Sequence, residues 1–171
     1  PTASTTAALA LGDALAVALM MARRFTDQDF ARYHPAGQLG RNLWLKVADV
    51  MHQNDAVAWV KPDTPVRQVI IAMSQRPLGA ACVVDEDFHL LGIITDGDVR
   101  RGLGKWGKAL FDMKASEVMS RDPKTIAAEE LAAKALAVME RHSITVLLVA
   151  DATGRAEGII HLHDILKKGI A

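Results

Sequence analysis

The sequence is poor in cysteine, in aromatic residues and in excess charge of either sign, and each shortage argues against a class of function. The single cysteine, Cys82, cannot form an internal disulfide, and its apolar neighbours predict a buried structural thiol in a reducing compartment. Aromatic residues make up 5% of the chain, too few for a platform that stacks single-stranded bases. Twenty basic and twenty acidic residues cancel, so no bulk charge attracts nucleic acid or an anionic membrane. We therefore expect neither partner.

Hydrophobic residues make up half of the 171 residues, which argues against disorder and allows one or two small domains. The most apolar run, residues 7–22, is short for a membrane span and contains Asp13 near its start. We expect a helix over Leu9–Arg24 that protein buries on most sides. No signal peptide is visible and the chain starts at Pro1, so we expect a piece of a longer, cytoplasmic protein.

The strongest pattern is a duplication. The segment Gly92–Arg101 recurs 66 residues later as Gly158–Lys167, and both copies have an acid six residues after the glycine, Asp98 and Asp164. Two short segments that end in Val-Met, at 48–51 and 116–119, recur at an offset of 68. Two copies of one unit therefore stand in tandem, with a loop two residues shorter in the second copy.

Each copy predicts the order strand, helix, strand, strand, helix, because apolar residues at helical spacing precede two short β-rich runs. One copy alone offers too little surface to bury its apolar face, so the two copies must pack together. We expect an α/β (α+β) fold with two small sheets, each packed with two helices. The expected domains are residues 1–46, 47–110 and 111–171.

The tandem order, the Val-Met leads and the Gly-x-x-Thr-x-x-Asp motif resemble a pair of CBS domains, from about Val47 to the end of the chain. The resemblance implies a nucleotide or related anion bound in clefts between the units, and a homodimer formed through the pair. It places Thr95 and Asp98 in the first site, with Arg100 and Arg101 as charge-assisted partners.

The chemistry of that motif suits a nucleotide. A carboxylate at a helix start accepts hydrogen bonds from both ribose hydroxyls, and a hydroxyl at the strand end donates to a phosphate or ribose oxygen. The helix N-terminus adds backbone N–H groups that favour an anion. The alternative is that Asp98 and Asp164 are simply helix caps.

The second site departs from the pattern, because His161 stands where the hydroxyl is expected, although Asp164 keeps the acid. A histidine titrates near about 6.5, so this site is either lost or sensitive to pH. His161 and His163 alternate along a strand and no acid-rich calcium loop follows Asp96, so we expect no metal site.

The first forty residues resemble the end of a sugar isomerase (SIS) domain, through the stretch His34-Pro-Ala-Gly-Gln-Leu-Gly40 and the segments around it. Followed directly by a CBS pair, they resemble the D-arabinose 5-phosphate isomerases. That family interconverts D-ribulose 5-phosphate and D-arabinose 5-phosphate for synthesis of Kdo, a sugar acid of lipopolysaccharide. Its enediol chemistry needs a general acid and base.

The resemblance assigns His34 to the active-site histidine of that family; the alternative is that His34 only orders the Pro-Gly loop. The phosphate loop, catalytic acids and lysine of the family would precede Pro1. We therefore expect the parent protein to be an isomerase and this chain alone to be inactive.

Two functions compete for the duplicated region. In the first, the pair is a sensor for CMP-Kdo, the pathway end product, or for an adenine nucleotide, with no other cofactor. CMP-Kdo offers a ribose to Asp98 and a carboxylate to Arg100 or Lys61, and Thr64 joins the candidate binding residues. In the second, the pair binds nothing and is a dimerising scaffold for isomerase domains, whose family is often tetrameric.

Overall fold

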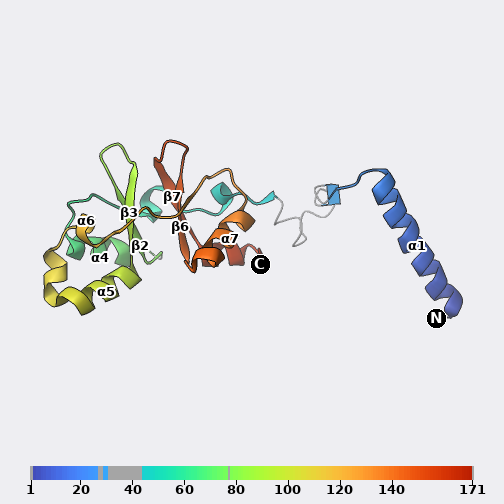
Figure 1. Ribbon diagram of the computed structural model, residues 1–171, viewed down its shortest axis with the longest axis horizontal. Coiled ribbons are helices and arrows are strands. Elements are labelled where there is room, and N and C mark those ends of the chain that lie inside the picture. Colours follow the sequence, from blue (N-terminus) through green and yellow to red (C-terminus); the bar gives the residue numbers. More distant parts are fainter. Residues whose placement is uncertain (1, 27–28, 31–43, 77, 171) are drawn as a thin grey trace. The chain divides into compact units, whose positions relative to one another are not determined.

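The computed structural model describes residues 2–26, 29–30, 44–76 and 78–170 (Figure 1). By its internal contacts the chain divides into two compact units, Pro1–Trp44 and Leu45–Ala171. The second unit contains both copies of the duplicated segment, which agrees with the predicted tandem arrangement.

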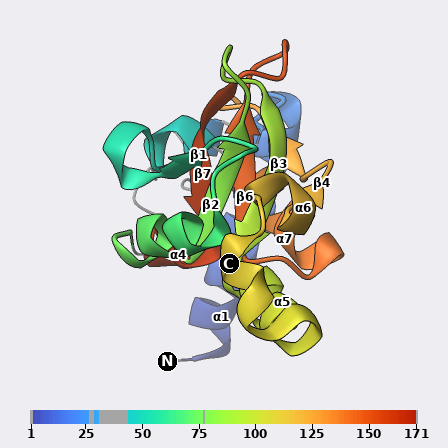
Figure 2. The ribbon, with the colours of Figure 1, turned by 90° about the vertical axis from the view of Figure 1, so that its left-hand side faces the viewer.

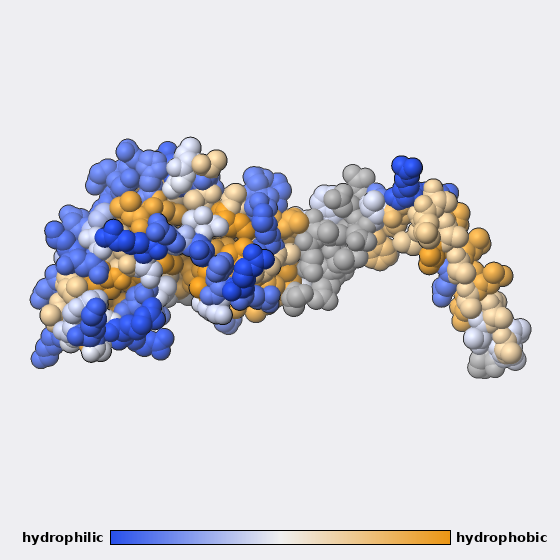
Figure 3. Space-filling view, viewed as in Figure 1, coloured by the Kyte–Doolittle hydropathy of each residue, from blue (hydrophilic) through white to orange (hydrophobic). Residues whose placement is uncertain are grey.

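The first unit contains helix α1, Ala3–Ala22. It begins six residues before the predicted start because the backbone N–H groups of Thr5 and Thr6 already bond to the carbonyl of Thr2. No residue of α1 is buried, so the described part of this chain does not supply the protein that the sequence predicts around this helix. The helix instead presents a largely hydrophobic surface (Figure 3). Among the described residues, α1 alone has the length and apolar composition of a membrane span, a criterion that core helices of soluble proteins also meet.

A capping box follows α1 at Thr26 and Asp29. The backbone N–H of Asp29 donates to Thr26 Oγ1 at 3.2 Å, and the backbone N–H of Thr26 donates to Asp29 Oδ2 at 2.9 Å. This reciprocal pair is the usual start of a helix. The segment 31–43, which contains His34, lies outside the described residues.

The second unit contains two small sheets, one for each copy (Figures 1 and 2). In each copy the short first strand is parallel to the second strand, and the second strand is antiparallel to the third. The first copy consists of β1 (Ala58–Val60), α4 (Val66–Ser74), β2 (Ala80–Val84), β3 (Leu90–Thr95) and α5 (Asp96–Trp106). The second consists of β5 (Thr125–Ile126), α7 (Ala132–His142), β6 (Val146–Ala150), β7 (Ala156–His161) and α8 (Leu162–Lys167). The predicted element order is therefore confirmed in both copies.

Short elements connect these strands and helices. Three are 3-10 helices, η1 (Val47–Asp49), η2 (Asn54–Ala56) and η3 (Gly107–Asp112). The others are α6 (Ala115–Val118) and β4 (Ser120–Arg121), which pairs with the free edge of β3. The loops that join β2 to β3 and β6 to β7 lie side by side (Figures 1 and 2), since the Leu90 N–H bonds to the Gly154 carbonyl.

The leading segments of the two copies are exchanged, which the sequence did not predict. Val47 and Val50 precede the first copy but are buried in the core of the second, whereas Ala115 precedes the second copy and is buried in the core of the first. At the end of each lead, His52 forms an antiparallel bridge with Ile159, and Ser120 pairs with Ile93. Each lead thus crosses to the other copy. We call residues 47–52 and 115–124 the two crossing segments.

A third hydrophobic cluster lies between the two sheets. It combines residues of the first sheet, including Ala80 and Cys82, with Leu148 and Ile159 of the second. Cys82 is fully buried here, and burial raises the pKa of its thiol to about 12. The predicted structural role of this cysteine is confirmed, since a neutral, enclosed thiol is a poor nucleophile.

Candidate functional site

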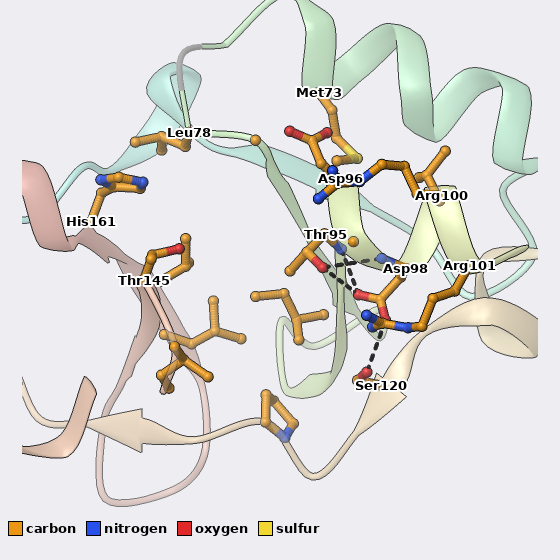
Figure 4. A pocket seen from close by; sticks show the side chains of 18 of the residues that line it. Met73, Leu78, Thr95, Asp96, Asp98, Arg100, Arg101, Ser120, Thr145 and His161 are labelled. Atoms are coloured by element: carbon orange, nitrogen blue, oxygen red, sulfur yellow. Dashed lines mark hydrogen bonds and ion pairs between the residues drawn. The ribbon is translucent and has the colours of Figure 1, made fainter. Parts of the chain in front are cut away.

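A cavity of about 960 Å³ lies where the ends of strands from both copies face each other (Figure 4). The first copy contributes the end of β3 and the start of α5, with Thr95 and Asp98, and the second contributes Thr145 and His161. The crossing segment 120–124 forms another wall. The end of α4 and the residues after it, within 70–79, complete the lining, so the cavity is built from several parts of the chain that are far apart in sequence.

Thr95 and Asp98 form a capping box at the start of α5. The backbone N–H and the hydroxyl of Thr95 donate to Asp98 Oδ2 at 2.8 and 2.6 Å, and the N–H of Asp98 points back to Thr95 Oγ1 at 3.3 Å. The interpretation of Asp98 as a helix cap is therefore correct, whatever else the residue does.

The other carboxylate oxygen of Asp98 faces the crossing segment and α5. Arg101 donates to Oδ1 at 2.6 Å and the Ser120 hydroxyl donates at 3.3 Å (Figure 4). Burial raises the pKa of Asp98, but the hydrogen bonds from Thr95 and the Arg101 charge outweigh it and hold that pKa below its usual value. With four donors, the acceptor capacity of this carboxylate is filled, so a ligand hydroxyl must displace one of them.

Cationic side chains outnumber acids around the cavity. Its lining includes four arginines and Lys124, against Asp96, Asp98 and Asp122. Among the described residues, Arg100, Arg121 and Lys124 form no ion pair. With His161 neutral, the lining carries an excess of two positive charges, which favours an anionic ligand.

His161 lies at the position of Thr95 in the second copy and also lines the cavity. Its Nδ1 accepts a hydrogen bond from the backbone N–H of His163 at 3.1 Å, so the imidazole caps α8 as the threonine caps α5. Burial and the neighbouring His163 lower the pKa of His161, which Asp164 raises in part. The ring is therefore mainly neutral at pH 7.

Three other predicted ligand residues do not line this cavity: Lys61, Thr64 and Asp164. The ammonium group of Lys61 donates to the backbone carbonyl of Asp85 at 2.6 Å and lies over the Phe88 ring. The Thr64 hydroxyl accepts the backbone N–H of Lys61 at 3.0 Å and so closes the turn before α4.

Asp164 also has protein partners of its own. His52 Nε2 donates to Asp164 Oδ2 at 2.8 Å, and Lys167 Nζ lies 3.6 Å from Oδ1. Partial burial raises the pKa of Asp164, while His52, Lys167 and His161 lower it, with a net fall. A ligand role for Asp164, Lys61 or Thr64 stays a prediction.

Sequence reasoning missed the part of the site that comes from the crossing segment. Ser120, Arg121 and Lys124 follow the second Val-Met lead and were not singled out. Arg76, near the end of α4, was missed too; its guanidinium bonds to the carbonyls of Asp55 and Ala72. The 68-residue offset already made Ser120 the counterpart of His52, which was the available signal.

The described residues contain no group of three or more histidine, cysteine or acidic side chains that could hold a metal ion. The expected absence of a metal site stays a prediction, because masked positions such as His34 are not part of that search.

Comparison with known families decides what this architecture is. The model of the CBS domain matches twice, at residues 47–105 and 115–170. The chain belongs to the CBS domain family. The predicted tandem CBS pair is thereby confirmed, and the two matches coincide with the two sheets of the second unit.

Curated relatives extend the similarity to the first segment. The chain is 46% identical over 170 residues to arabinose 5-phosphate isomerase KdsD of Pseudomonas aeruginosa, covering 99% of this chain and 52% of that protein. It is 40% identical over 170 residues to the protein of the same name in Escherichia coli K12, covering 99% and 51%. The predicted resemblance to arabinose 5-phosphate isomerases is confirmed, and the chain spans about half the length of these relatives.

Solved structures agree on the fold of the CBS pair. CBSX2 in complex with AMP matches with a TM-score of 0.65 at 20% identity, over 73% of this chain and 96% of that one. The CBS pair of protein MJ0100, solved with 5'-methylthioadenosine and S-adenosyl-L-methionine, matches with a TM-score of 0.64 at 22% identity, over 71% and 93%.

Proposed function

We propose that the CBS pair of this chain is a regulatory module that binds a nucleotide-type anion in the 960 Å³ cavity between its two copies. The observation that carries the proposal is the combination of the Thr95–Asp98 pair at the start of α5 with three cationic side chains that form no ion pair among the described residues. Neutral walls would suit an apolar ligand, whereas this lining suits a phosphate or carboxylate.

Binding at Asp98 requires an exchange of partners. Ribose hydroxyls reach the carboxylate only if Arg101 or Ser120 releases Oδ1. The Arg101 side chain is 73% exposed, so it is free to turn outward. Once released, its guanidinium is available to a ligand phosphate, so the ribose and the phosphate of one ligand favour the same rearrangement.

The chemical class of the ligand is a nucleotide, and two candidates compete. Adenine nucleotides are supported by the similar folds of CBSX2, solved with AMP, and of the MJ0100 pair, solved with adenosine-type ligands. CMP-Kdo carries a ribose, a phosphate and an additional carboxylate, so its two anionic groups could engage Arg100 and Arg121 separately.

For the whole protein, we propose a cytoplasmic arabinose 5-phosphate isomerase of the Kdo pathway, as the curated relatives suggest. His34 is then its active-site histidine, and the CBS pairs associate as a homodimer within a tetramer. In this proposal the present chain supplies regulation and has no isomerase activity alone; conversion of D-ribulose 5-phosphate by the 171-residue chain would contradict it.

The decisive experiment is a calorimetric titration of the chain with CMP-Kdo, CMP, AMP and ATP, repeated with Arg121→Ala. Arg121 lines the cavity and caps no helix, whereas Asp98→Ala would also remove a helix cap. We expect binding of one ligand and a loss of roughly 10- to 100-fold in affinity, since a charge-assisted hydrogen bond contributes roughly 1.5–3 kcal/mol.

The matched control is Arg155→Ala, an arginine in the loop before β7 that does not line the cavity. It should leave the affinity unchanged. The alternative function, a dimerisation scaffold without a ligand, is supported by the four protein donors that already occupy Asp98. Failure of all four compounds to bind would favour the scaffold.

A further inference from the structure

We infer that the acidic position of the second copy is an internal joint between the two copies, formed by His52 and Asp164, and that the chain therefore takes one anionic ligand and not two. The joint stands on geometry alone, whereas the single ligand rests on the function proposed above.

The joint connects a crossing segment to the copy against which it packs. His52 precedes the first copy, and its imidazole reaches Asp164 at the start of α8 with a distance of 2.8 Å between Nε2 and Oδ2. The backbone of His52 is held at the same place, because it exchanges hydrogen bonds with Ile159 of β7 at 2.7 and 3.0 Å. Side chain and backbone thus fix one residue at two points.

The charged groups around this joint belong to β7 and α8. Lys167 lies 3.6 Å from the second oxygen of Asp164, and the His161 and His163 rings lie 5.2 Å apart beside it. Both oxygens of Asp164 therefore face cationic or polar groups of the protein. The side chains of His52 and Asp164 are only 30% and 23% exposed, so solvent screens their contact incompletely.

The corresponding position in the first copy is built differently. Ser120 is the counterpart of His52 at the 68-residue offset, and its hydroxyl lies 3.3 Å from Asp98. A long hydrogen bond from a small hydroxyl gives way to a ligand at little cost. The bond from the His52 imidazole to Asp164 is shorter, at 2.8 Å, and is therefore the stronger of the two.

The cations that make the first site attractive to an anion are missing at the equivalent positions. At the offset of 66, Arg100 corresponds to Leu166; at the offset of 68, Arg121 and Lys124 correspond to Gln53 and Ala56. At the offset of 66, Arg101 corresponds to Lys167, whose ammonium group faces Asp164. The duplicate has therefore kept the acid and lost the anion site.

A double-mutant cycle on the 171-residue chain tests the joint without any ligand. Urea midpoints are measured at pH 7 for the wild type, His52→Ala, Asp164→Asn and the double variant. We expect each single variant to lower the urea midpoint. The double variant should lower it by no more than the larger of the two single-variant losses. Losses that add in full, or no loss in either single variant, would overturn the joint.

The chain offers a matched control in His89→Ala. His89 Nδ1 lies 3.2 Å from Asp85 Oδ2, a histidine–aspartate pair within one loop that is more exposed and does not join the copies. We expect a smaller fall in its urea midpoint than for His52→Ala. His52→Asn provides a second variant that keeps a polar side chain if truncation prevents folding.

The number of ligands is tested by calorimetry with AMP as the probe, on the wild type and on His52→Ala. One AMP per chain in both proteins supports the inference, and two per chain in the wild type overturns the single site. If AMP does not bind while the cycle shows coupling, the joint stands and the proposed nucleotide function fails for this probe. The two proposals are thereby separated.

Discussion

At the scale of single residues, Asp98 combines a structural and a proposed binding role in one carboxylate. Its oxygens cap α5 through Thr95 and hold Arg101 and Ser120. Its environment lowers its pKa, so its contribution to stability depends on pH.

We predict that Asp98→Asn lowers the free energy of unfolding by about 1 kcal/mol at pH 7, the usual value of a lost cap. Because the folded-state pKa of Asp98 is depressed, the contribution is fully present above the unfolded value of about 3.9 and is lost as the pH falls through the folded value. The difference between wild type and variant should therefore shrink in acid, as measured by urea unfolding at pH 7, 4 and 2.5.

The control for this prediction is Asp96→Asn, in the same first turn of α5 but outside the capping box. It should change stability little at any of these pH values. A difference between wild type and Asp98→Asn that stays constant down to the lowest pH would show that the charge of Asp98 is not what stabilises the helix.

The sequence predicted those site residues that share one motif. Thr95, Asp98 and Arg101 stand within seven positions and reach the cavity together. Ser120 lies 22 residues from Asp98, and His52 lies 112 residues from Asp164. No local period connects such pairs, so only the exchanged leads of the fold could bring them together.

At the scale of elements, two glycines explain how the crossing segments fit. A Cβ on Gly92 would lie 2.8 Å from the carbonyl oxygen of Ser120, and a Cβ on Gly158 would collide with the carbonyl oxygen of His52. The glycine that opens each duplicated motif thus allows the backbone of the other lead to pack against the strand.

We predict that Gly92→Ala and Gly158→Ala each destabilise the protein by roughly 1–3 kcal/mol, since the added methyl meets backbone that cannot turn away. Thermal unfolding followed by circular dichroism measures the effect. Gly104→Ala is the control, because it lies inside α5 with no atom within 4 Å of the added Cβ, and it should stabilise by about 0.5–1 kcal/mol. Unfolding temperatures that fall equally in all three variants would contradict this account.

Element order was predictable because apolar periodicity is local, whereas the partners of the leads were not. The short β-rich runs that form β2, β3, β6 and β7 and the helical spacing in α4 are visible along the chain. The leads are too short to show any period, and their apolar residues fit either core equally well by composition. Their placement follows from tertiary packing. Val47 is an example, since it precedes the first copy but is buried in the core of the second.

At the scale of the whole molecule, α1 leaves a large apolar surface uncovered. Leu11 and Met21 are 72% and 76% exposed, and Leu9 and Leu15 are exposed by more than half. Exposed apolar patches of this kind promote association in water.

We predict that removal of residues 1–44 lowers self-association, because it deletes this surface and leaves the compact unit Leu45–Ala171. Sedimentation velocity at several concentrations should show larger species for the full chain than for the shortened one. Equal distributions would show that α1 does not drive association, and would leave the CBS pair as the source of any dimer.

The exchange of leads has a consequence for the origin of the chain. A protein with only one copy of the unit would leave the groove beside its third strand unfilled. Its own lead would have no second core to pack against. A second molecule would supply a lead for that groove and a core for that lead, as in a domain-swapped dimer. Gene fusion of two such molecules gives the connectivity seen here, with His52 and Ser120 still at the two junctions and free to diverge. In the present chain the His52 imidazole bonds to Asp164 at the first junction, and the Ser120 hydroxyl forms a longer bond to Asp98 at the second.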